Sequence, residues 1–342
     1  MPVINTTLTL EDLPLPPPDK SGWPWTNRSQ SLPEPIPDGF EWPLISIVTP
    51  SYNQGQYIEE TIRSVLLQGY PNLEFIIIDG GSSDNSVEII QKYEPWLTYW
   101  VSEPDKGQTD AIQKGFNLST GVLVNWLNSD DVLEANALQK IAIAYQNHPS
   151  ATMYSGDLTV FGEGEDVLAP KCFQNLSELI CIWERWAVPQ PAVFLSRNSC
   201  LEVNGLHTSL QYAMDYELYL RLAQLPGFNV YNIDAPVARI RRHSESKTSS
   251  QQVPFRREIL EVFDNFAKNN PSLLPQGWRR SRALFEYISA LTFAEYHTKK
   301  EVSELSLASF IKLSIPYFMS ICRYRFFWGV LRQKISEKFF KV

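Results

Sequence analysis

From residue 44 onward, short apolar runs alternate with stretches whose apolar residues recur at helical spacing. Ile58, Ile62 and Val65, for example, would share one face of a helix. Such alternation is typical of successive βαβ units, which build a mostly parallel sheet flanked by helices. The expected strands are 44–49, 73–78, 97–101 and 122–127, and the expected helices are 57–67, 84–93, 109–118 and 134–146. We therefore predict an α/β, Rossmann-like fold with its ligand site outside the carboxyl ends of these strands.

After residue 150 the pattern becomes mixed, and this half should cap or extend the same sheet. The elements expected there are strands at 151–161, 190–196 and 228–233, a helix at about 213–224, a loop at 239–250 and helices from Pro254 onward. The sequence thus predicts three parts. They are a Pro-rich N-terminal arm at 1–43, a main domain at 44–250 and a helical C-terminal extension at 251–342.

The composition excludes several classes of protein. Of the 342 residues, 44% are hydrophobic and 20% are charged, which is too apolar for a disordered chain and sufficient for a sizeable core. The net charge of −8 argues against nucleic-acid binding as a main function, because displacing counterions from phosphates requires clustered Lys and Arg. The four cysteines are too few for a disulfide framework and too far apart for a paired-cysteine zinc site. We expect an enzyme or a small-molecule binder with buried free thiols.

The two ends of the chain differ from its middle. Residues 1–43 contain ten of the 24 prolines, and their Trp residues favour an arm strapped onto the domain over a disordered tail. Residues 310–342 interleave aromatic residues with Lys and Arg, so they could lie on an anionic membrane surface or pack their apolar side on the domain. Neither a signal peptide nor a run of about 18 apolar residues is found. We expect a cytoplasmic protein, with peripheral contact to the inner membrane face as an open alternative.

Polar clusters follow two of the expected strands. The first, 79–84 (Asp-Gly-Gly-Ser-Ser-Asp), could turn sharply and hydrogen-bond a ribose or base, although Asp84 is also explained as a helix N-cap. The second, 128–131 (Asn-Ser-Asp-Asp), contains adjacent carboxylates, which repel unless a cation such as Mg²⁺ or Mn²⁺ lies beside them. This cluster predicts a divalent metal site completed by substrate phosphates; the alternative is a turn in which Asp131 caps the next helix.

Five segments of the chain form a pattern: 50–53 (Pro-Ser-Tyr-Asn), 79–84, 103–111 (Glu-Pro-Asp-Lys-Gly-Gln-Thr-Asp-Ala), 128–131 and 214–218 (Met-Asp-Tyr-Glu-Leu). In this order and spacing they resemble family-2 glycosyltransferases over about residues 44–250. The resemblance implies an A-type glycosyltransferase fold, a nucleotide-diphosphate sugar donor, a Mn²⁺ or Mg²⁺ ion and inversion at the anomeric carbon. It also implies a nucleotide-sugar-binding half at 44–150 and an acceptor half at 151–250.

Matched position by position, the resemblance implies roles for the donor-binding residues. Pro50 and Tyr52 would form the wall of the base pocket, and Asp79 would hydrogen-bond the base. The remaining contacts to the nucleotide, ribose or sugar would come from Asp105, Lys106, Asp110 and Asp130.

The resemblance also implies which residues carry the chemistry. Asp131 would ligate the metal, and His243 could approach the metal or the diphosphate, unless it lies on an ordinary surface loop. Asp215 would be the base that takes the proton of the acceptor hydroxyl, with helix N-capping as its alternative role and Glu217 as a second candidate. Asn128 departs from the family, because many members carry a further acid there, and so leaves open how many protein groups hold the ion.

The expected activity is transfer of one sugar to a glycan or lipid-linked acceptor, in cell-surface polysaccharide synthesis. Single addition is favoured because the transmembrane helices and Gln-x-x-Arg-Trp motif of processive members are not found in the sequence. One alternative is a sugar nucleotidyltransferase, but 49–53 (Thr-Pro-Ser-Tyr-Asn) is not the Gly-rich, basic loop expected there. Another is a non-catalytic sugar-nucleotide binder, against which the acids at 130, 131 and 215 argue.

Overall fold

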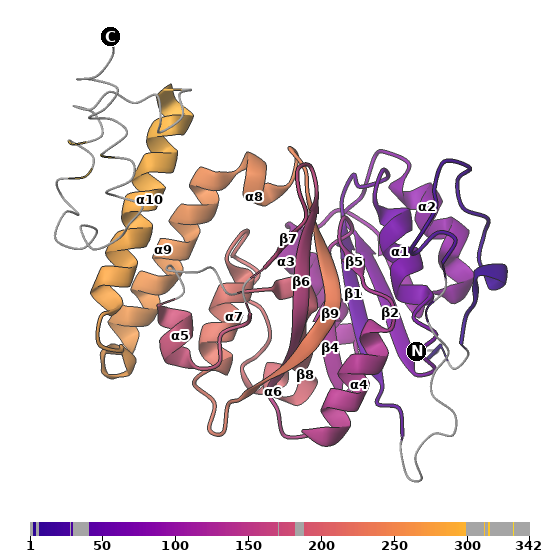
Figure 1. Cartoon of the computed structure of the whole chain (residues 1–342), viewed down its shortest axis with the longest axis horizontal. Coiled ribbons are helices and arrows are strands. Elements are labelled where there is room, and N and C mark those ends of the chain that lie inside the picture. The colour runs from indigo at the N-terminus through magenta and orange to yellow at the C-terminus, as the bar shows by residue number, and fades with distance from the viewer. Residues whose placement is uncertain are drawn as a thin grey trace. The chain divides into compact units, whose positions relative to one another are not determined.

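A computed structural model describes most of the chain, and its elements are labelled in Figure 1. The described residues are 3, 4, 7–27, 29, 41–169, 171–181, 188–298, 311, 314 and 331. They divide into two compact units, the first drawn from 1–175 and 187–243 and the second from 176–186 and 244–342. The domain bounds predicted above, at residues 43 and 250, stay a prediction.

Four parallel strands begin the sheet of the first unit. They are β1 (Ile45–Ser51), β2 (Leu73–Asp79), β3 (Tyr99–Ser102) and β4 (Leu123–Trp126). In the register of the pairs, Ser51 faces Asp79 and Asp79 faces Ser102, so these strands end at one edge. The predicted parallel half is therefore confirmed, and its polar clusters follow the carboxyl ends of the strands.

Helices cover both faces of this half, as the apolar spacing predicted. They are α1 (Ile58–Leu66), α2 (Ser86–Tyr93), α3 (Gln108–Leu118) and α4 (Ala137–Asn147). Ile62 and Ile90 join Ile45 in one core cluster, on the face that α1, α2 and α4 cover in Figure 1. On the other face, α3 approaches β1 so closely that a Cβ at Gly115 would come within 2.3 Å of the Val48 side chain. Only glycine fits at that position.

The second half of the unit extends the sheet in mixed orientation. Its strands are β5 (Val132–Leu133), β6 (Met153–Gly162), β7 (Val167–Leu168), β8 (Val193–Ser196) and β9 (Val230–Arg242). The strand order is β3-β2-β1-β4-β8-β6-β9-β5, and β7 pairs with β6. The α/β fold is confirmed. The expected loop at 239–250 is wrong for its first four residues, because β9 continues beside β6 as far as Arg242, and for its last four, which form a short helix.

Short helices connect these strands, and longer ones form the second unit. Those of the first unit are η1 (Leu10–Asp12), η2 (Glu94–Trp96), η4 (Gln190–Ala192), α6 (Arg197–Glu202) and α7 (Met214–Leu222). Those of the second are α5 (Leu176–Ile180), α8 (Lys247–Ser250), α9 (Gln252–Asn269), η5 (Pro271–Leu273) and α10 (Trp278–Thr298). Helices α9 and α10 pack together through Phe263 and Trp278, whose ring centroids lie 5.7 Å apart. No helix in the described part of the chain has the length and apolar character that crossing a membrane requires.

The N-terminal arm packs on the first unit, which confirms the expected strap for its described residues. Trp25 is buried, and the indole of Trp23 donates a hydrogen bond to the carbonyl of Leu133. Arg63 of α1 is fully buried, and its guanidinium donates to the carbonyls of Pro14, Pro24 and Trp25. The basic segment 310–342, predicted to contact a membrane or the domain, lies almost entirely outside the described residues.

Candidate active site

Asp79 ends β2 and is completely buried. Its Oδ2 accepts hydrogen bonds from the backbone N of Gly81 (3.1 Å) and Ser82 (2.9 Å) and from Oγ of Ser102 (2.7 Å). The carboxylate therefore holds the turn 80–82 against β3. A role in hydrogen-bonding a base stays a prediction, and the rigid turn is what the geometry supports directly.

The aromatic residue of the first motif lies open to solvent. The Tyr52 side chain follows β1 and is 62% exposed, whereas Pro50 lies within the strand and is buried. Large aromatic side chains are usually mostly buried. The exposed ring beside the carboxyl end of β1 is therefore available for stacking on a planar ligand.

The loop before α3 and the first turn of that helix place three more of the expected residues together. Asp105 Oδ1 accepts a hydrogen bond from Gly107 N (2.8 Å), and Asp110 Oδ2 accepts one from Lys106 N (3.2 Å). Because a Cβ at Gly80 would come within 2.7 Å of Asp105 Oδ2, this loop lies directly against the turn after β2. Asp105 and Lys106 are exposed at that edge.

The acid cluster that follows β4 contains two carboxylates in different surroundings. Asp130 is partly exposed, and its Oδ2 lies 2.9 Å from Nε2 of the buried His243. Asp131 is buried, and its Oδ1 accepts a hydrogen bond from the backbone N of Arg241 (2.9 Å). Burial and then the adjacent Asp130 raise the pKa of Asp131 well above its ordinary value. Since α4 begins only at Ala137, Asp131 does not cap that helix.

Asn128 connects this cluster to α3. Its Nδ2 donates to Asp131 Oδ2 (3.0 Å), and its Oδ1 accepts from Nε2 of Gln108 (2.7 Å). Both ends of the amide are thus engaged within the protein. The departure from the family at this position places a neutral group beside the buried Asp131.

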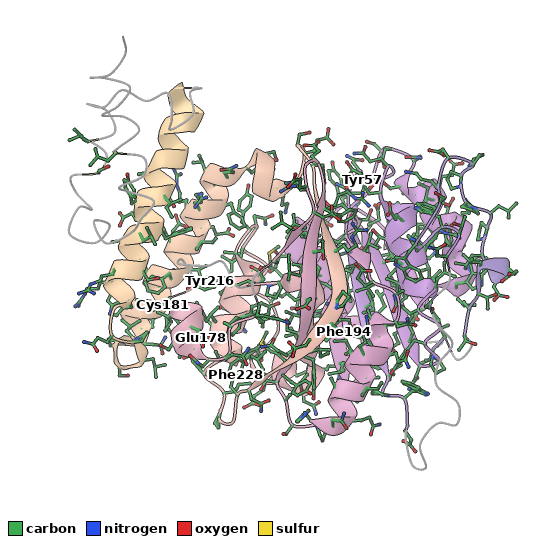
Figure 2. All side chains as sticks on the ribbon, in the orientation of Figure 1. Tyr57, Glu178, Cys181, Phe194, Tyr216 and Phe228 are labelled. Atoms are coloured by element: carbon green, nitrogen blue, oxygen red, sulfur yellow. The ribbon has the colours of Figure 1, made fainter. Side chains whose placement is uncertain are left out.

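Two residues at the start of α1, neither of them predicted from the sequence, contact His243 or its neighbour Arg241. The ring of Tyr57, labelled in Figure 2, lies with its centroid 4.8 Å from that of His243. Glu60 accepts a hydrogen bond from Arg241 Nη2 at 2.9 Å. Their positions on a helix face carry no local signal, because the partners are about 180 residues away.

Asp215 lies in the first turn of α7, where it is partly buried. The helix begins at Met214 after an N-cap at Ala213, so Asp215 is not the N-cap. Burial and then the nearby carboxylate of Asp215 raise the pKa of Tyr219, one turn further on. Glu217, the second candidate for the base, instead forms an ion pair with Arg221 at 2.6 Å.

Two of these side chains could together ligate a metal ion. Within the described ranges, no group of three or more His, Cys, Asp and Glu side chains could hold an ion. Asp130 and His243 nevertheless form a two-donor set at 2.9 Å. Neighbouring corners of an octahedral Mg²⁺ shell lie about 3 Å apart, so this pair fits an open site that substrate phosphate and water complete.

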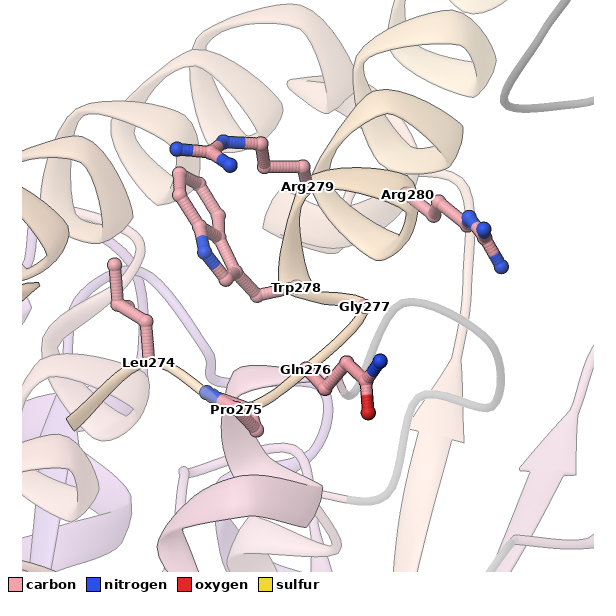
Figure 3. A pocket seen from close by; sticks show the side chains of 7 residues that line it. All are labelled: Leu274, Pro275, Gln276, Gly277, Trp278, Arg279 and Arg280. Carbon is pink, nitrogen blue, oxygen red and sulfur yellow. The ribbon is translucent and has the colours of Figure 1, made fainter. Parts of the chain in front are cut away.

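Two hollows in the described part of the chain are lined by other residues than the predicted ones. One, of about 580 Å³, is lined by residues 274–280 of the second unit and is shown in Figure 3. There the guanidinium of Arg279 stacks over the Trp278 ring, 5.1 Å from its centroid. A second, of about 260 Å³, lies between α3 and α6 and includes Arg197 and Cys200. Neither contains a pair of acidic groups.

A family model decides what kind of domain this is. Residues 46–179 match the model of glycosyl transferase family 2. This segment therefore resembles family-2 glycosyltransferases. The matched residues include the turn held by Asp79 and the acid cluster with Asp130, while Asp215 and His243 lie beyond them.

Known proteins that this chain resembles agree with the match to the family model. An uncharacterized glycosyltransferase of Nostoc sp. is 29% identical over 169 residues, which are 46% of this chain and 52% of that protein. Chondroitin synthase of Escherichia coli is 28% identical over 200 residues, which are 56% of this chain and 28% of that protein. The chain thus spans about half of the first relative and less of the second.

A solved structure supports the fold. The crystal structure of S. aureus TarS 1–349 in complex with UDP-GlcNAc matches with a TM-score of 0.55 at 14% sequence identity. The match covers 86% of this chain and 91% of the TarS chain. At this identity the likeness confirms the glycosyltransferase fold alone.

Proposed function

We propose that this chain transfers one sugar from a nucleoside-diphosphate sugar to a hydroxyl of a glycan or lipid-linked acceptor, with inversion at the anomeric carbon. The observation that carries the proposal is the contact between Asp130 and His243, at the end of β9 and beside the loop after β4. This contact joins a carboxylate and an imidazole at the sheet edge where open α/β folds bind ligands. The similarity to a chondroitin synthase supports a place in polysaccharide synthesis.

The proposed ligands of a divalent metal are Asp130 and His243. The resemblance implies Asp131 as the carboxylate ligand, but Asp131 is buried and accepts hydrogen bonds from Arg241 N and Asn128 Nδ2. We therefore move this role to Asp130, whose carboxylate is partly exposed and faces His243. When bound, Mn²⁺ or Mg²⁺ would stabilise the negative charge on the departing diphosphate.

The donor would bind along the edge formed by the turn after β2 and the loop before α3. Tyr52 offers an exposed ring for stacking on the base, and Asp79 keeps the turn beside it rigid. Lys106 adds an exposed positive charge, and Asp110 holds its backbone. The S. aureus TarS complex with UDP-GlcNAc, on a similar fold, supports a donor of this class.

Asp215 is the proposed general base. A carboxylate within hydrogen-bond reach of the acceptor hydroxyl would take its proton as the oxygen attacks the anomeric carbon. Attack on the face opposite the leaving diphosphate inverts that carbon. Glu217 is a weaker candidate because Arg221 occupies both of its carboxylate oxygens.

The proposal is tested by release of nucleoside diphosphate from a panel of nucleotide sugars with Mn²⁺ and a mixture of glycan acceptors. Asp130→Asn should lower the release by about 10²–10³-fold, the usual cost of losing one preorganised electrostatic group. Asp166→Asn is the matched control, because Asp166 is exposed and pairs with Arg239 outside the site. Equal release by wild type and Asp130→Asn would overturn the assignment.

Two alternative functions predict no release of nucleoside diphosphate and are recognised in separate assays. A sugar nucleotidyltransferase would form pyrophosphate from a nucleoside triphosphate and a sugar phosphate. A non-catalytic binder would gain thermal stability with a nucleotide sugar but release nothing. Neither outcome is expected.

A further inference from the structure

Arg241, near the end of β9, contacts the acid cluster through its backbone and through its side chain. Its backbone N donates to Asp131 Oδ1 at 2.9 Å. Its Nε donates to the main-chain carbonyl of Asp130 at 3.0 Å, and its Nη2 donates to Glu60 Oε2 at 2.9 Å. One residue thus joins β9, the loop after β4 and helix α1.

Two aromatic rings fix the orientation of the Arg241 guanidinium. Its Cζ lies 4.9 Å from the ring centroid of Tyr57 and 4.4 Å from that of Phe161. The side chain is only 14% exposed. A planar guanidinium that stacks on two rings has little freedom to rotate. The directions of its hydrogen bonds to Asp130 and Glu60 are therefore fixed.

The contacts of Arg241 constrain the distance between the side chains of Asp130 and His243. The two residues come from segments 113 positions apart, and their side chains meet at 2.9 Å. Arg241 precedes His243 by two residues on one segment and holds the peptide of Asp130 on the other. Tyr57, which stacks on the Arg241 guanidinium, also lies against the His243 ring.

We propose that Arg241 is a positioning residue that sets Asp130 and His243 in the geometry needed for metal and diphosphate binding. This inference rests on the proposed function of that pair. Arg241 acts through the peptide of Asp130 and the strand carrying His243. Lysine keeps the charge but cannot bond the Asp130 carbonyl and Glu60 at once in the planar geometry of a guanidinium.

The experiment measures Mn²⁺ binding to the full chain without donor, from the electron paramagnetic resonance signal of free Mn²⁺, together with the melting temperature. Arg241→Lys should weaken Mn²⁺ binding by about 10–100-fold, as is usual when a residue that orients metal ligands is lost. Glu60→Gln should weaken it less, because Arg241 keeps its bond to the Asp130 carbonyl.

Arg239→Lys is the matched control. Arg239 lies on the same strand and stacks on the same Phe161 ring, at 4.2 Å, but its carboxylate partners are Asp166 and Glu134. This variant should bind Mn²⁺ as wild type does. Asp130→Asn tests the metal site itself and should lose binding.

The outcomes separate the two proposals. If Asp130→Asn binds Mn²⁺ like wild type, the metal assignment of the proposed function is wrong, whatever Arg241 does. If Asp130→Asn loses binding while Arg241→Lys and Glu60→Gln bind as tightly as Arg239→Lys, the positioning role is overturned. A lower melting temperature with unchanged Mn²⁺ affinity would mean that Arg241 serves stability alone, which also overturns it. Should Arg241→Lys fail to fold, Glu60→Gln decides.

Discussion

Nδ2 of Asn128 lies 3.0 Å from Oδ2 of the buried Asp131 and donates a hydrogen bond to it. A carboxylate at position 128 would instead face a second carboxylate in a buried site. Like charges at hydrogen-bond distance destabilise each other strongly when water cannot screen them. The neutral amide is therefore what allows Asp131 to hold the backbone of β9 through Arg241.

We expect Asn128→Asp to lower the free energy of unfolding by about 1–3 kcal/mol. The variant replaces an amide that donates a hydrogen bond to Asp131 with a carboxylate that has no hydrogen to donate. Urea unfolding at neutral pH, followed by circular dichroism, measures the change. Asn117→Asp is the control, since Asn117 is exposed on α3, and it should change stability little. A variant at 128 as stable as the one at 117 would show that the amide is not required.

Glu74 gives the fold a pH dependence away from the candidate site. Burial alone would raise the pKa of this carboxyl, but hydrogen bonds from Ser46 Oγ and from Thr120 outweigh burial and lower it. A carboxyl whose pKa is lower in the folded chain stabilises the fold above its unfolded pKa of about 4.5, and that stability is lost as the pH falls through the folded pKa. The contribution is therefore full at neutral pH.

Glu74→Gln should accordingly destabilise the chain most at pH 7, and the difference from wild type should shrink as the pH falls below about 4.5. Urea midpoints measured across this range follow the change. Glu94→Gln serves as control because Glu94 is exposed, and its difference from wild type should stay small at every pH. If the loss of stability in Glu74→Gln did not vary with pH, its cause would be packing and not the charge of Glu74.

The parallel half of the sheet could be predicted from sequence because its signals are local. Apolar runs of strand length and helix faces of period 3.6 appear within a few residues of each other between 44 and 146. The end of β9 could not, because Arg239, Arg241 and Arg242 suggest a solvated loop. In the fold, distant acids and carbonyls pair with these arginines, and β6 supplies the strand partner.

The roles of the two adjacent acids show a second limit of prediction from sequence. Asp130 and Asp131 are chemically identical, and no spacing rule separates them. Only the fold makes one partly exposed toward His243 and the other a buried acceptor for Arg241. A burial difference of this kind depends on contacts about 110 residues away, which a single sequence does not contain.

Arg63 should be essential to the attachment of the N-terminal arm. Arg63→Met removes the donors to the carbonyls of Pro14, Pro24 and Trp25 and leaves buried acceptors unpaired. We expect a loss of about 2–4 kcal/mol in the free energy of unfolding and faster proteolysis within the arm than within the sheet. Lys92→Met is the control, because Lys92 forms a partly exposed ion pair with Glu59. It should change neither the free energy of unfolding by that amount nor the rate of proteolysis within the arm. Cleavage of the arm at the wild-type rate would contradict the anchoring role.

Asp215→Asn should separate chemistry from donor binding. The substitution keeps the shape of the side chain but removes its ability to accept a proton, so transfer should fall by about 10²–10⁴-fold while the donor dissociation constant stays near wild type. Transfer is measured as product formation at saturating donor, and binding is measured by calorimetry with a nucleotide sugar and Mn²⁺.

Glu217→Gln is the matched control. Glu217 lies one turn of α7 before its ion-pair partner Arg221. If Asp215 is the base, Glu217→Gln should keep most of the transfer rate, and any loss should be accompanied by a lower melting temperature, because the pair with Arg221 connects α7 to the carbonyl of Gly205. The opposite pattern, with Asp215→Asn active and Glu217→Gln inactive but fully folded, would assign the proton transfer to Glu217. The geometry disfavours that result, since both oxygens of the Glu217 carboxylate accept hydrogen bonds from the Arg221 guanidinium, which makes that carboxylate a weak proton acceptor.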